Sequence, residues 1–175
     1  MTTNSATDSI RMMPVKEWPL RFDSHKFSAR CYDTLECAVR YAGLEYGDER
    51  PSPPPSTYGP GYLDNWSGTH GMIRNFPPPA QVAWRSKDGQ AHTAEIDIGK
   101  IFRDQVIRHN VQREEMAELP DGDYQSEPSI MLEVNDRSVR VYMRAMIFLK
   151  QQKLIAGHMR SASRNDLVLV KAYTF

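Results

Sequence analysis

The stretch from Ser129 to Lys150 reads Ser-Ile-Met-Leu-Glu-Val-Asn-Asp-Arg-Ser-Val-Arg-Val-Tyr-Met-Arg-Ala-Met-Ile-Phe-Leu-Lys. Apolar residues alternate with other residues on both sides of Asn135-Asp136, and this period of two is typical of an antiparallel hairpin with one buried face. The residues expected on that face are Ile130, Leu132, Val134, Val139, Val141, Met143, Ala145, Ile147 and Leu149. The stretch therefore predicts a hairpin whose second strand runs to Lys150.

A second hairpin is predicted upstream of this one. Residues 81–86 form its first strand, and residues 91–98 form the return strand with His92 on the apolar face. The turn between them contains Asp88-Gly89, and Asp-Gly between alternating strands is one of the strongest hairpin signals. We expect His92 to be a hydrogen-bonded core histidine.

The other predicted elements are short. We expect strands at 26–32, 37–46, 106–111 and 167–175 (the last an interior strand), a helical turn or a strand end at 101–102, helical turns at 112–119, and a basic loop at 154–165. A short helix over 33–43 is an alternative to the second strand, because Asp33-Thr-Leu-Glu36 resembles a capping box. The chain is thus predicted to be mainly β, an antiparallel β-sandwich or a curled sheet with one or two short helices. A single domain over 18–175 would follow a flexible lead over 1–17.

The two hairpins are separated from the N-terminal strands by a long Pro-rich loop. Residues 50–79 contain eight of the twelve prolines, and such a composition cannot form a central strand. A connection of this length in a compact domain is usually functional or disordered. Four aromatic residues favour an ordered loop that packs over one sheet edge: Tyr58, Tyr62, Trp66 and Phe76.

The charges balance overall but are segregated along the chain. With 22 basic and 22 acidic residues, the chain lacks the basic surplus of a general nucleic-acid binder. Residues 137–164 carry seven Lys and Arg and no acid, whereas residues 114–127 carry six acids and no Lys or Arg. This pattern fits either two solvated faces or a bipolar surface that steers a charged protein partner.

No apolar run is long enough to cross a membrane, and the N-terminus does not resemble a signal peptide. Cys31 and Cys37 are either reduced or joined by a disulfide, and the bonded form requires a turn at Asp33-Thr34. Two cysteines are too few for a zinc site. The acidic run lacks the glycine and the closing glutamate of a calcium loop, since Ser126 and Leu132 stand there. We expect no metal and no cofactor.

No catalytic motif is recognisable, so we expect a protein that is not an enzyme. His70 and Asp64, with Trp66 between them, could form a small polar site, but no nucleophile can be assigned beside them. Trp66, Tyr62 and Arg74 have the composition of a binding hot spot. The alternative is that Trp66 and Phe76 simply fill the core.

A group of short motifs resembles a bacterial family, the small immunity proteins encoded beside type VI secretion effectors, and in particular those paired with lipase-type effectors. The resemblance covers residues 18–175. The motifs are Asn65-Trp-Ser-Gly68, Asn75-Phe-Pro-Pro-Pro-Ala80, Val82-Ala-Trp-Arg-Ser-Lys-Asp-Gly89, His92, Ile96-Asp-Ile-Gly99, Ile101-Phe102, His109-Asn-Val111, Arg113-Glu-Glu115, Glu133-Val-Asn-Asp-Arg137 and Val141-Tyr-Met143.

This resemblance implies an inhibitor that binds a cognate secreted toxin, a phospholipase effector, and occludes its active site. Family members that guard against phospholipases are typically periplasmic and often lipoproteins. This chain departs from the pattern because it carries no leader or lipobox cysteine. Two locations therefore stay open: the periplasm, with the lipid anchor missing from this chain, and the cytoplasm. The residues we expect at the interface are Tyr62, Asp64, Trp66, His70, Arg74, Arg140 and Arg144.

Two other functions are compatible with the same residues. The first is a small-ligand module of the cell envelope, in which the Pro-rich loop and its aromatic residues form a sugar or lipid cleft. The second, less favoured, is a hydrolase that uses His70 and Asp64.

Overall fold

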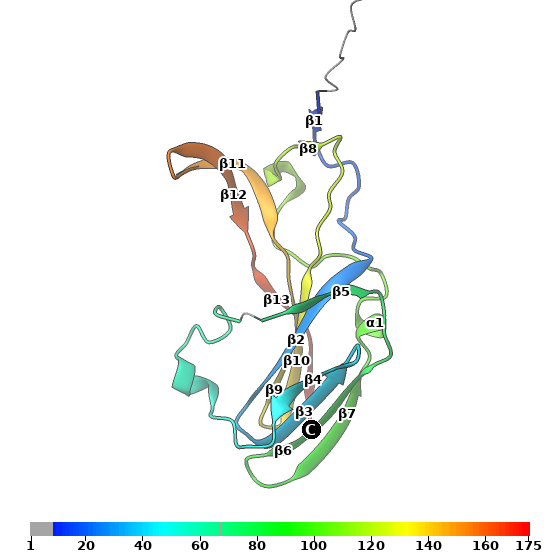
Figure 1. Cartoon of the computed structure of the whole chain (residues 1–175), viewed down its shortest axis with the longest axis vertical. Helices are drawn as coiled ribbons and strands as arrows, with labels where there is room; N and C mark the ends of the chain where they lie inside the picture. The colour runs from blue at the N-terminus through cyan, green and yellow to red at the C-terminus, as the bar shows by residue number, and fades with distance from the viewer. Residues whose placement is uncertain (1–8, 67) are drawn as a thin grey trace, which may run out of the picture.

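The computed structural model describes residues 9–66 and 68–175, and it is mainly β, as the sequence predicted (Figure 1). Two sheets make up the body. The larger sheet has the strand order β13 (Leu167–Thr174), β10 (Ser138–Arg144), β9 (Ser129–Asn135), β2 (Ser24–Tyr32) and β5 (His70–Arg74). The smaller sheet has the order β4 (Leu44–Asp48), β3 (Thr34–Tyr41), β6 (Ala80–Ser86) and β7 (Ala91–Ile96). The smaller sheet is wholly antiparallel, whereas β2 and β9 of the larger sheet run parallel.

Two further strand pairs extend from the body. They are β1 (Met12–Met13) with β8 (Leu119–Pro120), and β11 (Ile147–Ile155) with β12 (His158–Arg164). The short helical segments are η1 (Pro55–Tyr58), α1 (Ile98–Ile101) and η2 (Arg113–Glu115). The part of the predicted N-terminal lead that the structure describes is attached to the body, because β1 pairs with β8 and Val15 is buried.

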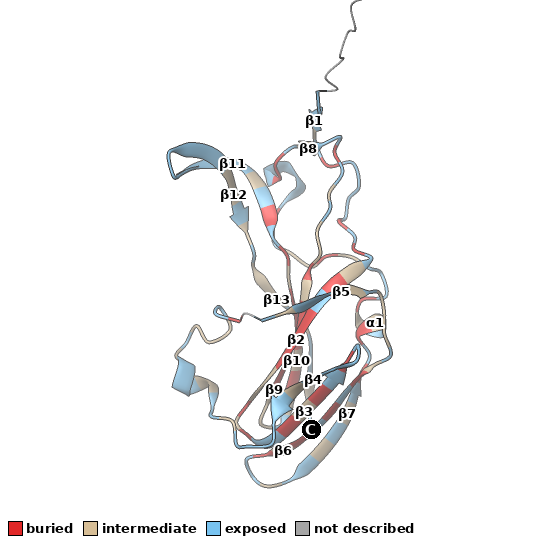
Figure 2. Cartoon of the chain, viewed as in Figure 1, coloured by how far each residue is buried: buried red, intermediate tan, exposed pale blue. Residues whose placement is uncertain are grey.

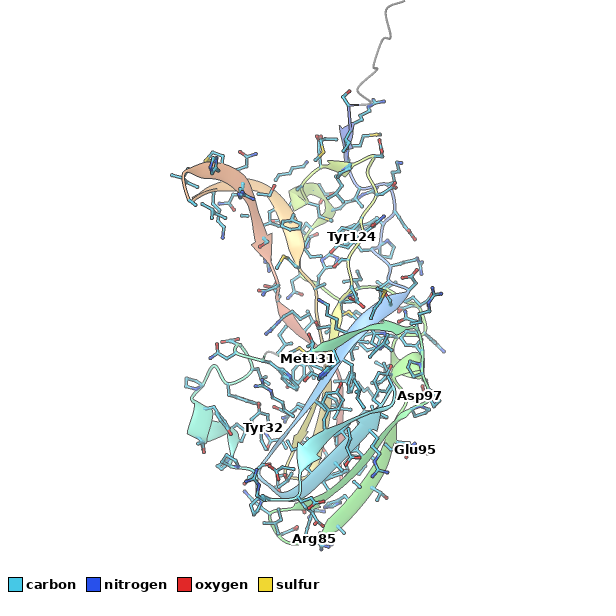
Figure 3. All side chains as sticks on the ribbon, viewed as in Figure 1. Tyr32, Arg85, Glu95, Asp97, Tyr124 and Met131 are labelled. Carbon is cyan, nitrogen blue, oxygen red and sulfur yellow. A yellow bond between two sulfur atoms is a disulfide. The ribbon has the colours of Figure 1, made fainter. Side chains whose placement is uncertain are left out.

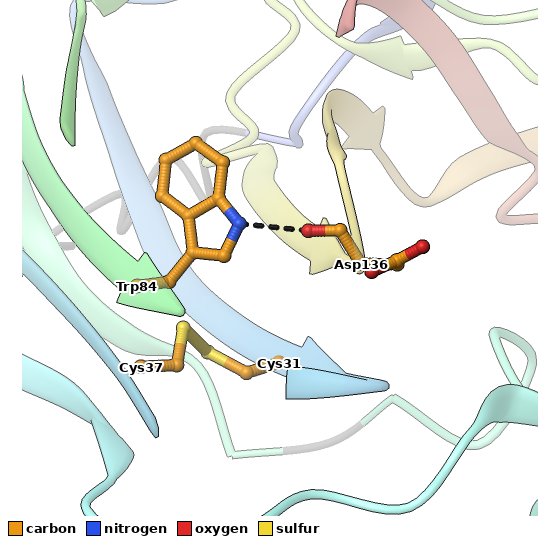
Figure 4. Close-up of a disulfide and its surroundings, with 4 residues drawn as sticks. All are labelled: Cys31, Cys37, Trp84 and Asp136. Carbon is orange, nitrogen blue, oxygen red and sulfur yellow. Dashed lines mark hydrogen bonds between the residues drawn. A yellow bond between two sulfur atoms is a disulfide. The ribbon is translucent and has the colours of Figure 1, made fainter. Parts of the chain in front are cut away.

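The core lies where the inward faces of the two sheets meet, and Figure 2 shows the buried residues concentrated there. Phe27 and Leu132 of the larger sheet and Val39 of the smaller sheet are completely buried. The indole Nε1 of Trp84 in β6 donates a hydrogen bond of 2.7 Å to the Asp136 carbonyl oxygen at the β9–β10 turn. Nearby, a disulfide joins Cys31 of β2 to Cys37 of β3 (Figure 4), so the bonded state is the one present. Its turn lies at Asp33, which has a φ of 55°.

The central hairpin is confirmed up to Arg144, but its second strand is shorter than predicted. β10 ends there, and β11 pairs with β12 instead of continuing in the larger sheet. Ala145 and Ile147 are still buried in the core, which maintains the apolar alternation past the point where the strand ends. For this reason the apolar alternation could not reveal that the strand ends at Arg144.

Several smaller predictions were wrong. Residues 154–165 are not a loop, since most of them belong to the β11–β12 hairpin, and the predicted interior strand at 167–175 is an edge strand. Residues 106–111 form only one isolated bridge, from Val106 to Arg21. The predicted strand over 37–46 is divided by a turn at Ala42-Gly43, and the alternative helix over 33–43 does not form. Over 112–119 the helical part is limited to η2.

The structure also contains the second predicted hairpin and the hydrogen-bonded histidine on it. β6 and β7 pair in antiparallel register, and the predicted helical turn corresponds to α1. His92 is half-buried, stacks on Trp84 with ring centroids 4.9 Å apart, and its Nε2 lies 3.0 Å from the Ser86 hydroxyl. It is therefore hydrogen-bonded at the margin of the core.

His25 in β2 is a completely buried histidine that the sequence did not single out. Its Nδ1 lies 2.7 Å from the Asn75 Oδ1 and its Nε2 lies 2.9 Å from the Tyr41 hydroxyl. The Asn75 amide nitrogen donates to the Phe22 carbonyl, so Oδ1 is the acceptor and the Nδ1–H of neutral His25 donates to it. Burial lowers the pKa of His25, while the Asn75 hydrogen bond opposes that shift.

This pKa shift predicts a loss of stability in mild acid. Below the unfolded pKa of about 6.5 the unfolded chain binds more protons than the folded chain, so the free energy of unfolding falls as the pH falls, until the pH reaches the folded pKa. Each proton contributes at most about 1.4 kcal/mol per pH unit. His109 contributes in the same direction, since burial and Arg164 lower its pKa.

Urea unfolding at about pH 7.5 and about pH 5.5 measures this effect. We expect His25→Gln to have a smaller difference between the two pH values than the wild type, with the remaining slope due to His109. An unchanged difference in His25→Gln contradicts the assignment.

Candidate binding site at the long loop

The Pro-rich loop between β4 and β5 lies against the outer face of the larger sheet, the face opposite the core (Figure 1). Three hydrogen bonds attach it there. The Tyr62 hydroxyl donates to Glu133 of β9 at 2.6 Å, and the Trp66 Nε1 donates to the Ser28 hydroxyl of β2 at 3.1 Å. Arg144 of β10 donates through Nη2 to the Leu63 carbonyl oxygen at 3.3 Å. The described part of the loop is thus fixed against the sheet, and the segment that follows it forms the edge strand β5.

Glu133 is the central acceptor of this attachment and is completely buried. Besides Tyr62, it accepts a hydrogen bond of 3.0 Å from Arg140 Nη1, whose side chain is 36% exposed. Burial is the main cause that raises the pKa of Tyr62, and the Glu133 carboxylate adds to it. The same two causes raise the pKa of Tyr142 to about 12. Both phenols therefore stay protonated at neutral pH, and Tyr62 remains a hydrogen-bond donor.

The side chain of Trp66 lies between the loop and the sheet and is only 4% exposed. It packs with Met131 and Tyr142 in a small apolar cluster on the outer face of the sheet, separate from the main core. The guanidinium of Arg30 lies over its ring at 5.5 Å. Trp66 is therefore a packing residue and not an exposed residue of a binding hot spot. Its side chain supports the loop from the side that faces the sheet.

A cleft of about 420 Å³ opens between the loop and the edge of β2. Tyr32 of β2 forms its wall and meets the loop residues Tyr58 and Tyr62 edge to face, at centroid distances of 5.8 and 5.1 Å. In Figure 3, Tyr32 and Met131 mark the sheet near the loop. Polar groups stand beside the three tyrosines in the lining, namely Arg30, Asp48, Ser52 and Asn65.

The structure brings together four of the residues predicted for the interface. Tyr62, Trp66, Arg140 and Arg144 surround the outer face of β9 and β10. Asp64 lies in the loop, and His70 and Arg74 lie on β5; all three are exposed. His70 approaches the Tyr46 hydroxyl at 3.3 Å, and within the described part of the chain no hydrogen bond joins it to Asp64.

The residues that sequence reasoning missed are those beneath the loop. Glu133 interrupts the apolar run of β9, and a lone carboxylate in such a strand is a signal of a buried, paired charge. Ser28, Tyr32 and Tyr142 gave no comparable signal, because alternation alone predicts a solvent-exposed sheet face at their positions.

Two negative findings apply to the residues that the structure describes. No three His, Cys, Asp or Glu side chains gather there into a group that could hold a metal ion. Within the same residues, no helix has both the length and the apolar character needed to span a bilayer.

No protein-family model, curated protein or solved structure matches the chain.

Proposed function

We propose that this protein is a non-enzymatic inhibitor that binds a secreted bacterial toxin, a phospholipase effector of a type VI secretion system, and covers its active site. The observation that carries the proposal is the attachment of the long loop. Tyr62, Trp66 and Leu63 fix its inner side to the sheet through three hydrogen bonds. A loop that is already ordered loses little conformational entropy on binding, and this favours tight association.

The outer side of the same segment presents a surface for such a partner. Met72 of β5 is 76% exposed and lies on the same strand as the exposed His70 and Arg74, while Tyr58 (56% exposed) and Asp64 are exposed elsewhere on the loop. Methionine, tyrosine and arginine are enriched in protein interfaces. The resemblance to type VI immunity proteins supplies the class of partner, and the exposed loop surface supplies the place where we propose that it binds.

Inhibition of a purified effector tests this proposal. Each secreted phospholipase of the source bacterium is assayed with and without the protein, and we expect one of them to be inhibited at a stoichiometric ratio. Met72→Glu places a charge on the β5 part of the proposed surface and is expected to weaken binding at least tenfold. Ala91→Glu adds the same charge at an exposed position of β7 and is expected to bind normally.

A second candidate function is favoured by the tyrosine cleft. Three tyrosines with neighbouring Arg30, Asp48 and Asn65 offer the stacking faces and hydrogen-bonding groups that suit an oligosaccharide. Inhibition of no effector, together with oligosaccharide-induced melting shifts that disappear in Tyr58→Ala, overturns the inhibitor proposal in favour of this one.

A further inference from the structure

The β11–β12 hairpin is a two-stranded ribbon that leaves the body after Arg144 and returns to it at Leu167 (Figure 1). Its base is attached, because the Ala117 amide donates to the Phe148 carbonyl at 2.9 Å and Met116 forms a bridge with Leu149. Beyond this point every residue from 150 to 160 is exposed, as Figure 2 shows. At about 3.3 Å per residue, this outer part of the ribbon reaches about 20 Å from its attachment.

The tip of the ribbon is apolar on both faces. Leu154, Ile155 and Met159 flank the turn at Ala156-Gly157 and are 68%, 41% and 60% exposed. Leu154 lies directly opposite Met159, so these two share one face, whereas Ile155 lies opposite His158 on the other face. Because apolar side chains lie on both faces of the projecting tip, burying all of them requires an apolar environment that surrounds the tip.

Cations lie immediately behind the apolar tip. Lys153 lies directly opposite Arg160, and like charges in direct cross-strand pairs destabilise a ribbon. No acidic residue occurs anywhere in 137–165, and no described salt bridge involves Lys150, Lys153 or Arg160. A counter-charge from outside the ribbon would relieve the repulsion within this pair.

We propose that this ribbon inserts its tip into the surface of a bilayer that contains anionic phospholipids. Leu154, Ile155 and Met159 enter the boundary between headgroups and acyl chains, and Lys153 and Arg160 contact lipid phosphates. The order of an apolar tip followed by cations matches the order of these layers in a membrane. An acidic protein partner would supply the same counter-charge. A flat protein surface covers only one face of the ribbon, however, so Ile155 on one face, or Leu154 and Met159 on the other, would stay in water.

This proposal goes beyond the proposed inhibitory function and uses a different part of the molecule. The ribbon forms a sheet of its own, whereas the proposed toxin surface lies on the long loop and on β5 of the larger sheet, so binding of a membrane and of a toxin can be separated by substitutions.

Sedimentation with vesicles tests the proposal, with phosphatidylcholine alone compared with phosphatidylcholine plus phosphatidylglycerol. We expect the full chain to bind the mixed vesicles at least tenfold more tightly and to be released by salt. Lys153→Gln with Arg160→Gln removes two cations worth about fivefold each, so we expect about a 25-fold loss. Leu154→Ser with Met159→Ser is expected to lose at least tenfold, because it removes two inserted apolar side chains.

Two control variants carry matched substitutions elsewhere. Leu44→Ser removes an exposed apolar side chain from β4, and Arg40→Gln removes an exposed cation from β3. Both are expected to bind vesicles as the wild type does, and thermal unfolding confirms that all variants are folded. The absence of binding to the mixed vesicles overturns the proposal, and so does binding that the ribbon variants leave unchanged. Loss of toxin inhibition in the ribbon variants without any vesicle binding assigns the ribbon to a protein partner instead.

Discussion

Replacing Arg140 with methionine is expected to lower the free energy of unfolding by about 3 kcal/mol. The substitution keeps an apolar side chain over the sheet but removes the charged partner of Glu133, which is completely buried. Leaving a buried carboxylate without its cation is one of the more costly single changes, typically about 3–5 kcal/mol. We place the value at the lower end because Tyr62 still donates to Glu133 and because the Arg140 side chain is 36% exposed, which admits water.

A double variant separates this electrostatic effect from a loss of packing. Glu133→Met combined with Arg140→Met removes both charges, and buried ion pairs can often be replaced by apolar residues at little cost. We expect urea unfolding to show the double variant to be more stable than Arg140→Met alone. A single variant that loses less than about 1 kcal/mol contradicts the role of Arg140 as the charge partner on which buried Glu133 depends.

Replacing Trp66 with alanine is expected to have a similarly large effect, but one centred on the loop. Removal of a buried tryptophan side chain usually costs about 3–5 kcal/mol, and relaxation of the loop places this site near the lower limit. The substitution also removes the hydrogen bond to Ser28 and the contacts with Met131 and Tyr142. We therefore expect the loop amides to exchange with solvent faster, and the affinity for the proposed toxin partner to fall.

Hydrogen exchange measured segment by segment distinguishes this result from general destabilisation. Trp66→Phe is the matched control, because it keeps an aromatic ring but loses the indole donor, at a cost of about 1 kcal/mol. Its loop amides are expected to stay protected. Faster exchange across both sheets in Trp66→Ala, with no excess in the loop, contradicts the role of Trp66 as the internal support of the loop.

The sequence predicted the fold best where apolar residues alternate with other residues along both strands of a hairpin. The hairpin around Asn135-Asp136 and the hairpin at Asp88-Gly89 both have this arrangement, and both were found. The β11–β12 ribbon was predicted as a loop because it buries neither face beyond Lys150, so its sequence has no apolar period. Strand formation there depends on cross-strand pairing alone, which a linear pattern does not report.

The candidate site was only partly predictable, for a related reason. Composition directed attention to the long loop and to Tyr62 and Trp66, but it could not tell an exposed anchor from a buried support. That difference arises from Glu133 and Ser28, which come from strands far away in the sequence. Only the folded arrangement brings these groups beneath the loop.

The parallel pairing of β2 with β9 has a consequence for the order in which the chain assembles. Lys26 pairs with Ser129, and these residues are 129 − 26 = 103 positions apart. At a synthesis rate of about 5–20 residues per second, β2 must wait about 5–20 s on the ribosome before its partner exists. Contacts between residues so distant in sequence slow folding. The β9–β10 hairpin, whose two strands are adjacent, can form as soon as it emerges and then serve as the template on which the N-terminal strand closes the larger sheet.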